Sequence, residues 1–257
     1  MHPDVEALTA IAREVAGAVR AAPVDGFGRV VGMGADGTFT KAVDSLAEAI
    51  ILKHAERRGW NVLSEEAGEV AYGGDRLLVV DPIDGTTNAS RGIPLYCISL
   101  ALGRRRLSDV DCGVVLNVAT GDVYAGVRGR GATLNGERIR TRPYDPDDLL
   151  VAPTLGKYAG PKAIALARLP FNVRSFGAAA LEMCFVASGG LDLYFYAPER
   201  MRVIDVAAST LIVREAGGRV LDAHGAELEM DLSLKPRTSV VAASGPEMLS
   251  AMEGVLT

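Results

Sequence analysis

Apolar residues recur at helical intervals in two segments near the start of the chain. Over residues 4–22 the spacing places Val5 and Leu8 on one face with later apolar residues, and Pro23 closes the pattern. Residues 44–58 repeat this spacing. The pattern therefore predicts two amphipathic helices, each with one face against a core.

Glycine dominates the segment between these helices, residues 24–40. Glycine adopts backbone conformations that other residues avoid, so a glycine-rich segment favours turns. The stretch GMGADGT within it predicts a mobile turn or the tip of a hairpin.

Short apolar runs predict strands from residue 62 onward. The runs at 62–64 and 77–80 each end in acidic residues. A β-rich region follows as far as Arg140, and Asn135-Gly136 within it is typical of a tight hairpin.

Strands and helices alternate after residues 142–148, a stretch rich in proline and aspartate. The expected strands are at 149–152, 171–174, 191–196, 219–222 and 239–243. The expected helices are at 161–168, 178–188, 205–216 and from Pro246 onward. The alternation predicts an α/β fold. We expect a single domain over 1–257 with two packed lobes, α+β over 1–145 and α/β over 146–257.

Composition narrows the classes of function. The net charge is −5 and no basic stripe occurs, which argues against nucleic-acid binding. No apolar run approaches the ~18 residues of a membrane span. Three scattered cysteines, and the acidic Asp4 and Glu6 where a signal peptide would be basic, favour a cytoplasmic protein with reduced thiols.

The stretch LLVVDPIDGTTN, residues 77–88, carries the clearest chemical signal. Asp81 and Asp84 would repel each other at the end of a buried strand unless a cation lay between them. Two carboxylates and the Ile83 carbonyl form a set of oxygen ligands that suits Mg²⁺. Gly85 permits a sharp turn, and the segment opened by Thr86 would expose N–H groups to an anion. Metal and anion sites on one turn predict a bound phosphate ester.

Further acidic residues occur at Asp44, Glu65-Glu66 and Asp205. Taken alone, Asp205 is more typical of a helix N-cap, and Glu65-Glu66 of a solvated loop.

DPIDGTTN resembles the first signature of the inositol monophosphatase family, and IDVAASTLIVREAGG resembles the second. The glutamates of LSEEAGE and the aspartate of TKAVDSLAE match further family positions, and all four matches occur in family order. The resemblance is strongest to archaeal members that hydrolyse both inositol 1-phosphate and fructose 1,6-bisphosphate. It implies a layered αβαβα sandwich and a homodimer.

The resemblance also implies residue roles. The metal ligands would be Glu65, Asp81, Ile83, Asp84 and Asp205, holding two or three Mg²⁺ ions, with Mn²⁺ as a substitute. The catalytic residues would be Asp44, Thr86 and Glu65, with Asp44 and Thr86 orienting the attacking water. The loop GMGADGTFTK would close over the site.

The family resemblance also implies which residues bind substrate. The residues would be Asp84, Gly85, Thr86, Arg174, Ala179, Arg200 and Arg202, with Arg174 and one of the other two arginines holding a second phosphate. The chain departs from the family at Ala89, at Ile204 and at Ala178, where a hydroxyl is missing. These departures affect the identity of the substrate rather than the metal set.

The expected function is therefore hydrolysis of inositol 1-phosphate and fructose 1,6-bisphosphate by metal-activated water. A 3′-phosphoadenosine 5′-phosphate (nucleotide) phosphatase and a non-catalytic metal- or phosphate-binding regulator remain alternatives. The low aromatic content, 5%, offers little for stacking an adenine ring.

Overall fold

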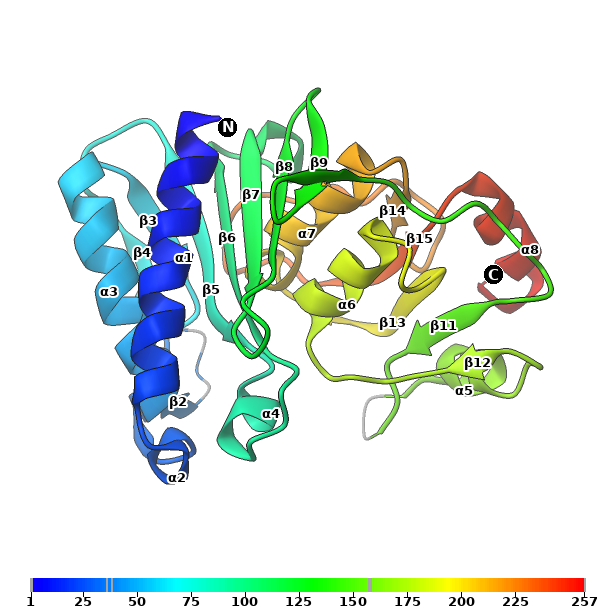
Figure 1. The fold of residues 1–257 in the computed structure, drawn as a ribbon, viewed down its shortest axis with the longest axis horizontal. Helices are drawn as coiled ribbons and strands as arrows, with labels where there is room; N and C mark the ends of the chain where they lie inside the picture. The colour runs from blue at the N-terminus through cyan, green and yellow to red at the C-terminus, as the bar shows by residue number, and fades with distance from the viewer. Residues whose placement is uncertain (1, 36, 38, 157–158, 257) are drawn as a thin grey trace.

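The two expected N-terminal helices lie side by side across one face of a large sheet (Figure 1). The structure is a computed structural model that describes residues 2–35, 37, 39–156 and 159–256. Helix α1 spans Pro3–Ala21, and α3 spans Ala42–Arg58. Helix α3 ends at Gly59, whose φ of 64° is left-handed and suits glycine.

The large sheet has eight strands in the order β10-β9-β8-β7-β6-β5-β3-β4. Neighbouring strands are antiparallel except β3 and β5, which are parallel. The strands are β3 Asn61–Ser64, β4 Gly68–Val70, β5 Leu77–Asp84, β6 Cys97–Gly103, β7 Cys112–Asn117, β8 Val123–Val127, β9 Gly131–Leu134 and β10 Glu137–Ile139. Asn135 and Gly136 form the predicted two-residue hairpin, and both have positive φ.

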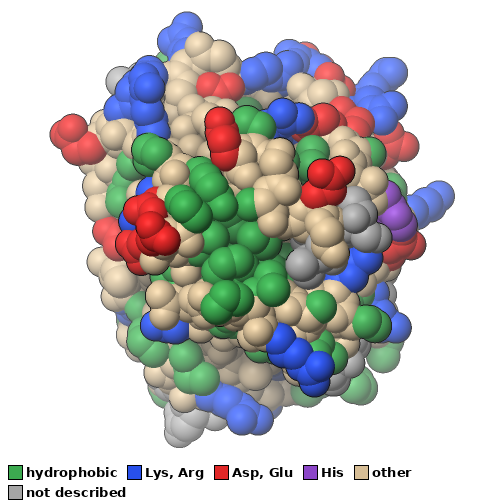
Figure 2. Space-filling model, turned by 90° about the vertical axis from the view of Figure 1, so that its right-hand side faces the viewer, with side chains coloured by type: hydrophobic (Ala, Val, Ile, Leu, Met, Phe, Trp, Pro, Cys, Tyr) green, Lys and Arg blue, Asp and Glu red, His purple; other side chains and the backbone are tan. Residues whose placement is uncertain are grey.

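The second sheet has five strands in the order β12-β11-β13-β15-β14. Its strands are β11 Leu150–Pro153, β12 Asn172–Val173, β13 Leu193–Met201, β14 Arg219–Leu221 and β15 Thr238–Ala243. Strands β12, β11 and β13 are parallel, whereas β13, β15 and β14 are antiparallel. Helices α5 (Pro161–Ala167) and α8 (Pro246–Leu256) cover its outer face. Figure 2 shows this end of the molecule, with apolar side chains gathered near its centre.

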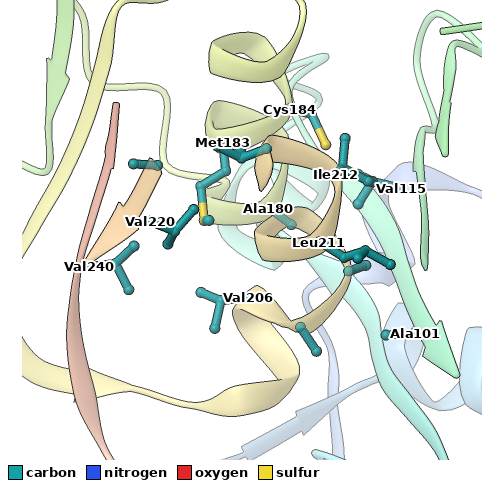
Figure 3. Packing of buried hydrophobic residues seen from close by; sticks show 14 of the residues in the cluster. Ala101, Val115, Ala180, Met183, Cys184, Val206, Leu211, Ile212, Val220 and Val240 are labelled. Carbon is teal, nitrogen blue, oxygen red and sulfur yellow. The ribbon is translucent and has the colours of Figure 1, made fainter. Parts of the chain in front are cut away.

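Helices α6 (Ala179–Ala187) and α7 (Val203–Glu215) fill the space between the sheets (Figure 1). Both are apolar on nearly every face, as expected of helices buried between two layers. Figure 3 shows Met183 and Leu211 packed between Val115 of the large sheet and Val240 of the small one. The expected α/β fold, a layered αβαβα sandwich, is confirmed.

Close packing of α7 on the large sheet depends on glycine. A Cβ atom added at Gly113 of β7 would lie 2.9 Å from the Cα atom of Ala208. Because Gly113 has no side chain, α7 can lie this close to β7 at Ala208. The interior position of α7 therefore follows from residues on two distant segments.

The shorter elements complete the fold. Helix α2 is Val24–Phe27, α4 is Thr86–Ser90, and the 3₁₀ turn η1 is Leu107–Asp109. Strands β1 (Val30–Met33) and β2 (Phe39–Lys41) pair as an antiparallel hairpin, as the sequence suggested. The tip of GMGADGTFTK includes residues 36 and 38, which lie outside the described residues, so its expected closure over the site stays a prediction. In the described part of the chain, no helix has the length and apolar character needed to cross a bilayer.

Candidate metal and phosphate site

Strand β5 continues further than the sequence suggested. It was expected to end at Asp81 but runs to Asp84, because β6 pairs with Asp81 through Ser99 and with Asp84 through Cys97. The register shifts between the two pairs, and Pro82 lies in that irregularity. Proline lacks an N–H group and is tolerated where a ladder is interrupted. The bulge therefore keeps both aspartates on a rigid strand.

Acidic side chains from three segments converge on one pocket of about 290 Å³. Asp81 and Asp84 come from β5, Glu65 from the turn after β3, and Asp205 from the first turn of α7. The Ile83 residue lines the same pocket. The structure thus brings together all five residues that the sequence assigned to metal, from segments up to 140 residues apart.

The electrostatics of this pocket disfavour bare carboxylates. Burial raises the pKa of Asp81 well above its ordinary value, and the charges of Asp84, Glu65 and Asp205 add to that shift. Burial, followed by the charge of Asp205, raises the pKa of Asp84 to about 7. Among the described residues, no hydrogen-bond partner reaches the buried Oδ1 atom of Asp81. An acceptor left without a partner in a crowd of carboxylates fits a divalent cation, so the donor set suits Mg²⁺.

Arg202 supplies positive charge to this cluster. Its Nη1 atom lies 2.6 Å from Oε1 of Glu65, and its Nη2 atom lies 2.8 Å from Oδ1 of Asp205. Arg202 lines the pocket, but its guanidinium group faces carboxylates rather than an open anion site. Its expected role in holding a substrate phosphate stays a prediction.

Asp205 does not cap α7 at the N-cap position, so that simple interpretation of the sequence was wrong. The N-cap is Arg202, and Asp205 is three residues later, where its Oδ2 atom accepts from the Arg202 N–H at 2.8 Å. Asp44 occupies the same position in α3 and accepts from the Lys41 N–H at 3.3 Å. Both carboxylates are thereby fixed by the first turn of a helix.

The two residues expected to orient water are differently placed. Thr86 lines the pocket, and its hydroxyl group donates to the Ile83 carbonyl at 3.0 Å. Asp44 does not line the pocket but lies close enough to Glu66 and Glu65 that their charges, added to its burial, raise its pKa to about 7.

Small residues line the pocket beside Asp84, at Gly85 and at Gly177, Ala178 and Ala179. Gly85 has a φ of 88°, and a Cβ atom there would lie 3.0 Å from the Leu95 carbonyl oxygen. The start of α6 faces this turn, and the Ala180 N–H donates to Oδ2 of Asp84 at 2.7 Å. Gly85 and Ala179 both line the pocket, and their expected contacts with substrate stay a prediction.

Two arginines predicted to bind substrate lie elsewhere. Arg174 is exposed, does not line the pocket, and donates to the carbonyl of the adjacent Val173 at 2.8 Å. Arg200 is also exposed and outside the pocket lining. Strand β13 extends to Met201, so Arg200 lies within the strand, beyond the end expected at residue 196.

Several polar residues that hold the site in place were missed in the sequence. Glu48 of α3 accepts from the hydroxyl of Ser64 and from the Ala67 N–H, and so fixes the turn that carries Glu65. Glu182 of α6 lines the pocket, and Asn88 of α4 bonds across to Phe176. In the sequence, Glu48, Asn88 and Glu182 are marked only by their positions in expected helices. Those positions do not show that the side chains point toward the site.

Comparison with known proteins agrees with this geometry. Residues 2–253 match the model of the inositol monophosphatase family. The chain is 39% identical over 225 residues to the fructose-1,6-bisphosphatase/inositol-1-monophosphatase of Thermococcus kodakarensis, covering 88% of this chain and 86% of the relative. It is 35% identical to the bifunctional NADP phosphatase/NAD kinase of Methanococcus maripaludis, covering 86% of this chain and 43% of that protein.

A solved structure of an inositol monophosphatase–fructose 1,6-bisphosphatase superposes with a TM-score of 0.88 at 31% identity. That match covers 99% of this chain and all of the other chain. Because the family match spans nearly the whole sequence and relatives of similar length exceed 30% identity, the chain belongs to the inositol monophosphatase family.

Proposed function

We propose that the protein is a Mg²⁺-dependent phosphoric monoester hydrolase that acts on inositol 1-phosphate and fructose 1,6-bisphosphate. The observation that carries this proposal is the convergence of Glu65, Asp81, Asp84 and Asp205 on one pocket beside the start of α6. The acidic side chains around the unpartnered Oδ1 atom of Asp81 favour binding of cations. The N–H groups at the start of the neighbouring helix favour binding of an anion.

The cations would be held by Glu65, Asp81, the Ile83 carbonyl, Asp84 and Asp205. When bound, Mg²⁺ supplies electrophilic stabilisation of the phosphoryl oxygens and of the leaving oxygen, and lowers the pKa of water. Mn²⁺ prefers the same oxygen ligands and would substitute.

The chain's own groups would orient the reactants. Backbone N–H groups at Gly85, Thr86 and the first turn of α6 would bind the phosphate oxygens. Asp44 and the Thr86 hydroxyl would hold water on the side of the phosphorus opposite the ester oxygen. Water then adds to phosphorus as the bond to the ester oxygen breaks, and the products are the free alcohol and inorganic phosphate.

The names of the relatives support this choice of substrate. The Thermococcus protein is named for both fructose 1,6-bisphosphate and inositol 1-phosphate. The Methanococcus relative is named as an NADP phosphatase, which keeps a nucleotide as the second candidate substrate. A non-catalytic regulator is the third possibility, and it is disfavoured because all the candidate acidic residues are present.

A phosphate-release assay separates these functions. The purified protein with Mg²⁺ would be given inositol 1-phosphate, fructose 1,6-bisphosphate, NADP and 3′-phosphoadenosine 5′-phosphate separately. We expect release from the first two that stops when EDTA is added. Faster release from the two nucleotides would favour the second candidate, and no release from any ester would favour the regulator.

The oligomeric state, the cellular location and the lobe boundary are proposed on the same basis. We infer a cytoplasmic homodimer of single-domain subunits, each divided near residues 142–148, where the chain passes from the large sheet to the small one. Sedimentation at equilibrium would show twice the subunit mass of 27.0 kDa if the dimer forms.

A further inference from the structure

The peptide of Phe176 is held from both sides just before α6. Asn88 donates from Nδ2 to the Phe176 carbonyl at 2.7 Å, and the same nitrogen donates to the Leu95 carbonyl at 2.7 Å. On the other side, Glu182 accepts from the Phe176 N–H and, at 3.1 Å, from the Gly177 N–H. The segment 176–180 is thereby joined both to the turn that follows β5 and to its own helix.

Glu182 is a buried carboxylate that the proposed chemistry does not use. It is only 2% exposed, yet it lies on the wall of the candidate site. A carboxylate at such a position is costly unless hydrogen bonds satisfy it. The two N–H groups provide those bonds, which explains how this side chain is tolerated there.

The hydrogen bonds to Glu182 also constrain the residues that follow Gly177 along the chain. Directly after the two residues whose N–H groups bind Glu182, Ala178 and Ala179 line the pocket, and the Ala180 N–H donates to Oδ2 of Asp84 at 2.7 Å. The residues between, Ala178 and Ala179, carry no hydroxyl group. At Ala178 and Ala179 an anion would therefore meet backbone rather than hydroxyl groups, and Glu182 and Asn88 hold the backbone that leads to these residues.

We propose that Glu182 is a positioning residue for phosphate binding. Through residues 176–177, it holds the backbone of Ala178 and Ala179, which line the pocket, against the phosphate, while Asn88 ties the same segment to the turn of Asp84 and Gly85. This role rests on the proposed function. The competing view is that Glu182 only stabilises the start of α6.

Asp192 offers a matched control. It is also 2% exposed and also accepts from a backbone N–H, that of Leu150 at 2.8 Å, but it does not line the pocket. Removing either carboxylate should destabilise the fold, since both leave a buried N–H unpaired. Only removal of Glu182 should alter phosphate binding.

The test compares Glu182→Ala, Glu182→Gln and Asp192→Ala with the wild type. For each, the KM for inositol 1-phosphate, the inhibition constant for inorganic phosphate, the Mg²⁺ concentration for half-maximal activity and the melting temperature are measured. Glu182→Ala should raise both the KM and the phosphate inhibition constant by about 10–100-fold, the usual effect of losing an outer-shell partner. The Mg²⁺ requirement should stay near that of the wild type. Glu182→Gln retains an acceptor oxygen and should restore most of the phosphate affinity.

Asp192→Ala should lower only the melting temperature. The inference is overturned if Glu182→Ala behaves like Asp192→Ala, with a lower melting temperature and unchanged phosphate affinity. Should Glu182→Ala fail to fold, Glu182→Asp replaces it in the test, because the shorter side chain withdraws from both N–H groups. A raised inhibition constant for inorganic phosphate in that variant supports the positioning role, and an unchanged constant overturns it. A wild type that releases no phosphate would instead contradict the proposed function.

Discussion

The guanidinium group of Arg202 lies 2.6 Å from the carboxylate of Glu65, and so links the start of α7 to the turn after β3. The same group pairs with Asp205. Arg202 therefore compensates two of the carboxylates that the family assigns to metal. A bound cation would take over part of that compensation, so arginine and metal both act on the stability of this site.

Replacing Arg202 should reveal this compensation. In EDTA, Arg202→Met should lower stability by about 3–5 kcal/mol, because it leaves the buried Asp205 and the half-buried Glu65 without a counter-charge. Mg²⁺ should then raise the melting temperature of the variant more than that of the wild type. Differential scanning fluorimetry with and without Mg²⁺ measures both effects. Arg174→Met is the control, because Arg174 is exposed and outside the pocket; equal Mg²⁺ shifts in the two variants would contradict the compensation.

Asp84 should be required for activity but not for folding. Asp84→Asn removes one charge from a crowded cluster and leaves the metal-free protein at least as stable as the wild type. Phosphate release should fall by at least about 100-fold, since even outer-shell changes at metal sites cost 10–100-fold. Steady-state kinetics and circular dichroism on one preparation give both results. An active variant would remove Asp84 from the proposed metal set.

The metal-free protein should lose stability as pH rises. Burial and the charges of Glu66 and Glu65 raise the pKa of Asp44 from 3.8 to about 7, and burial with the charge of Asp205 raises that of Asp84 to about 7. The folded state thus holds these protons more tightly than the unfolded state. The resulting stabilisation is complete below the unfolded pKa and is lost as pH rises through about 7.

Urea unfolding in EDTA between about pH 5 and about pH 8 would measure this loss. The double variant Asp44→Asn, Asp84→Asn should show a flatter dependence. Stability that rises with pH in the wild type would contradict the assignment of protons to these two groups.

Gly85 should be intolerant of even one methyl group. Its φ of 88° is left-handed, and a Cβ atom would lie 3.0 Å from the Leu95 carbonyl oxygen and 3.1 Å from the Cβ atom of Ala178. Gly85→Ala should cost more than the ~1–2 kcal/mol of the backbone strain alone and should reduce activity.

Gly73→Ala separates the two contributions. Gly73 has a φ of 87° with no atom of another segment within 4 Å of an added Cβ, so its replacement should cost only the backbone strain. Chemical denaturation of both variants measures the difference. Equal losses would show that close approach at Gly85 adds nothing.

Much of this architecture was predictable because short-range patterns reflect it. Helical spacing located α1 and α3 within two residues of their observed ends, and Asn135-Gly136 marked its hairpin. The motif around Asp81 and Asp84 indicated a cation site because two aspartates this close at the end of an apolar run repel each other unless a positive charge lies between them.

The parts that were not predictable depend on long-range packing. The extension of β5 to Asp84 comes from pairing with β6, which a local pattern does not contain. The inward direction of Glu182 depends on how α6 packs between the two sheets (Figure 1), and the helical spacing of residues 178–188 does not show which face of the helix turns toward the site. The ion pairs of Arg202 with Glu65 and Asp205 also join distant segments, whereas its expected role at the substrate stays a prediction.

The central claim is that acidic residues from three distant segments of the chain form one metal site. A crystal of the protein soaked in Mn²⁺ and examined by anomalous diffraction tests it most directly, because Mn²⁺ prefers the same oxygen ligands as Mg²⁺. We expect anomalous peaks among Glu65, Asp81, Asp84 and Asp205, with Arg202 displaced from at least one carboxylate. Peaks only elsewhere on the protein, or none at saturating Mn²⁺, would contradict the claim.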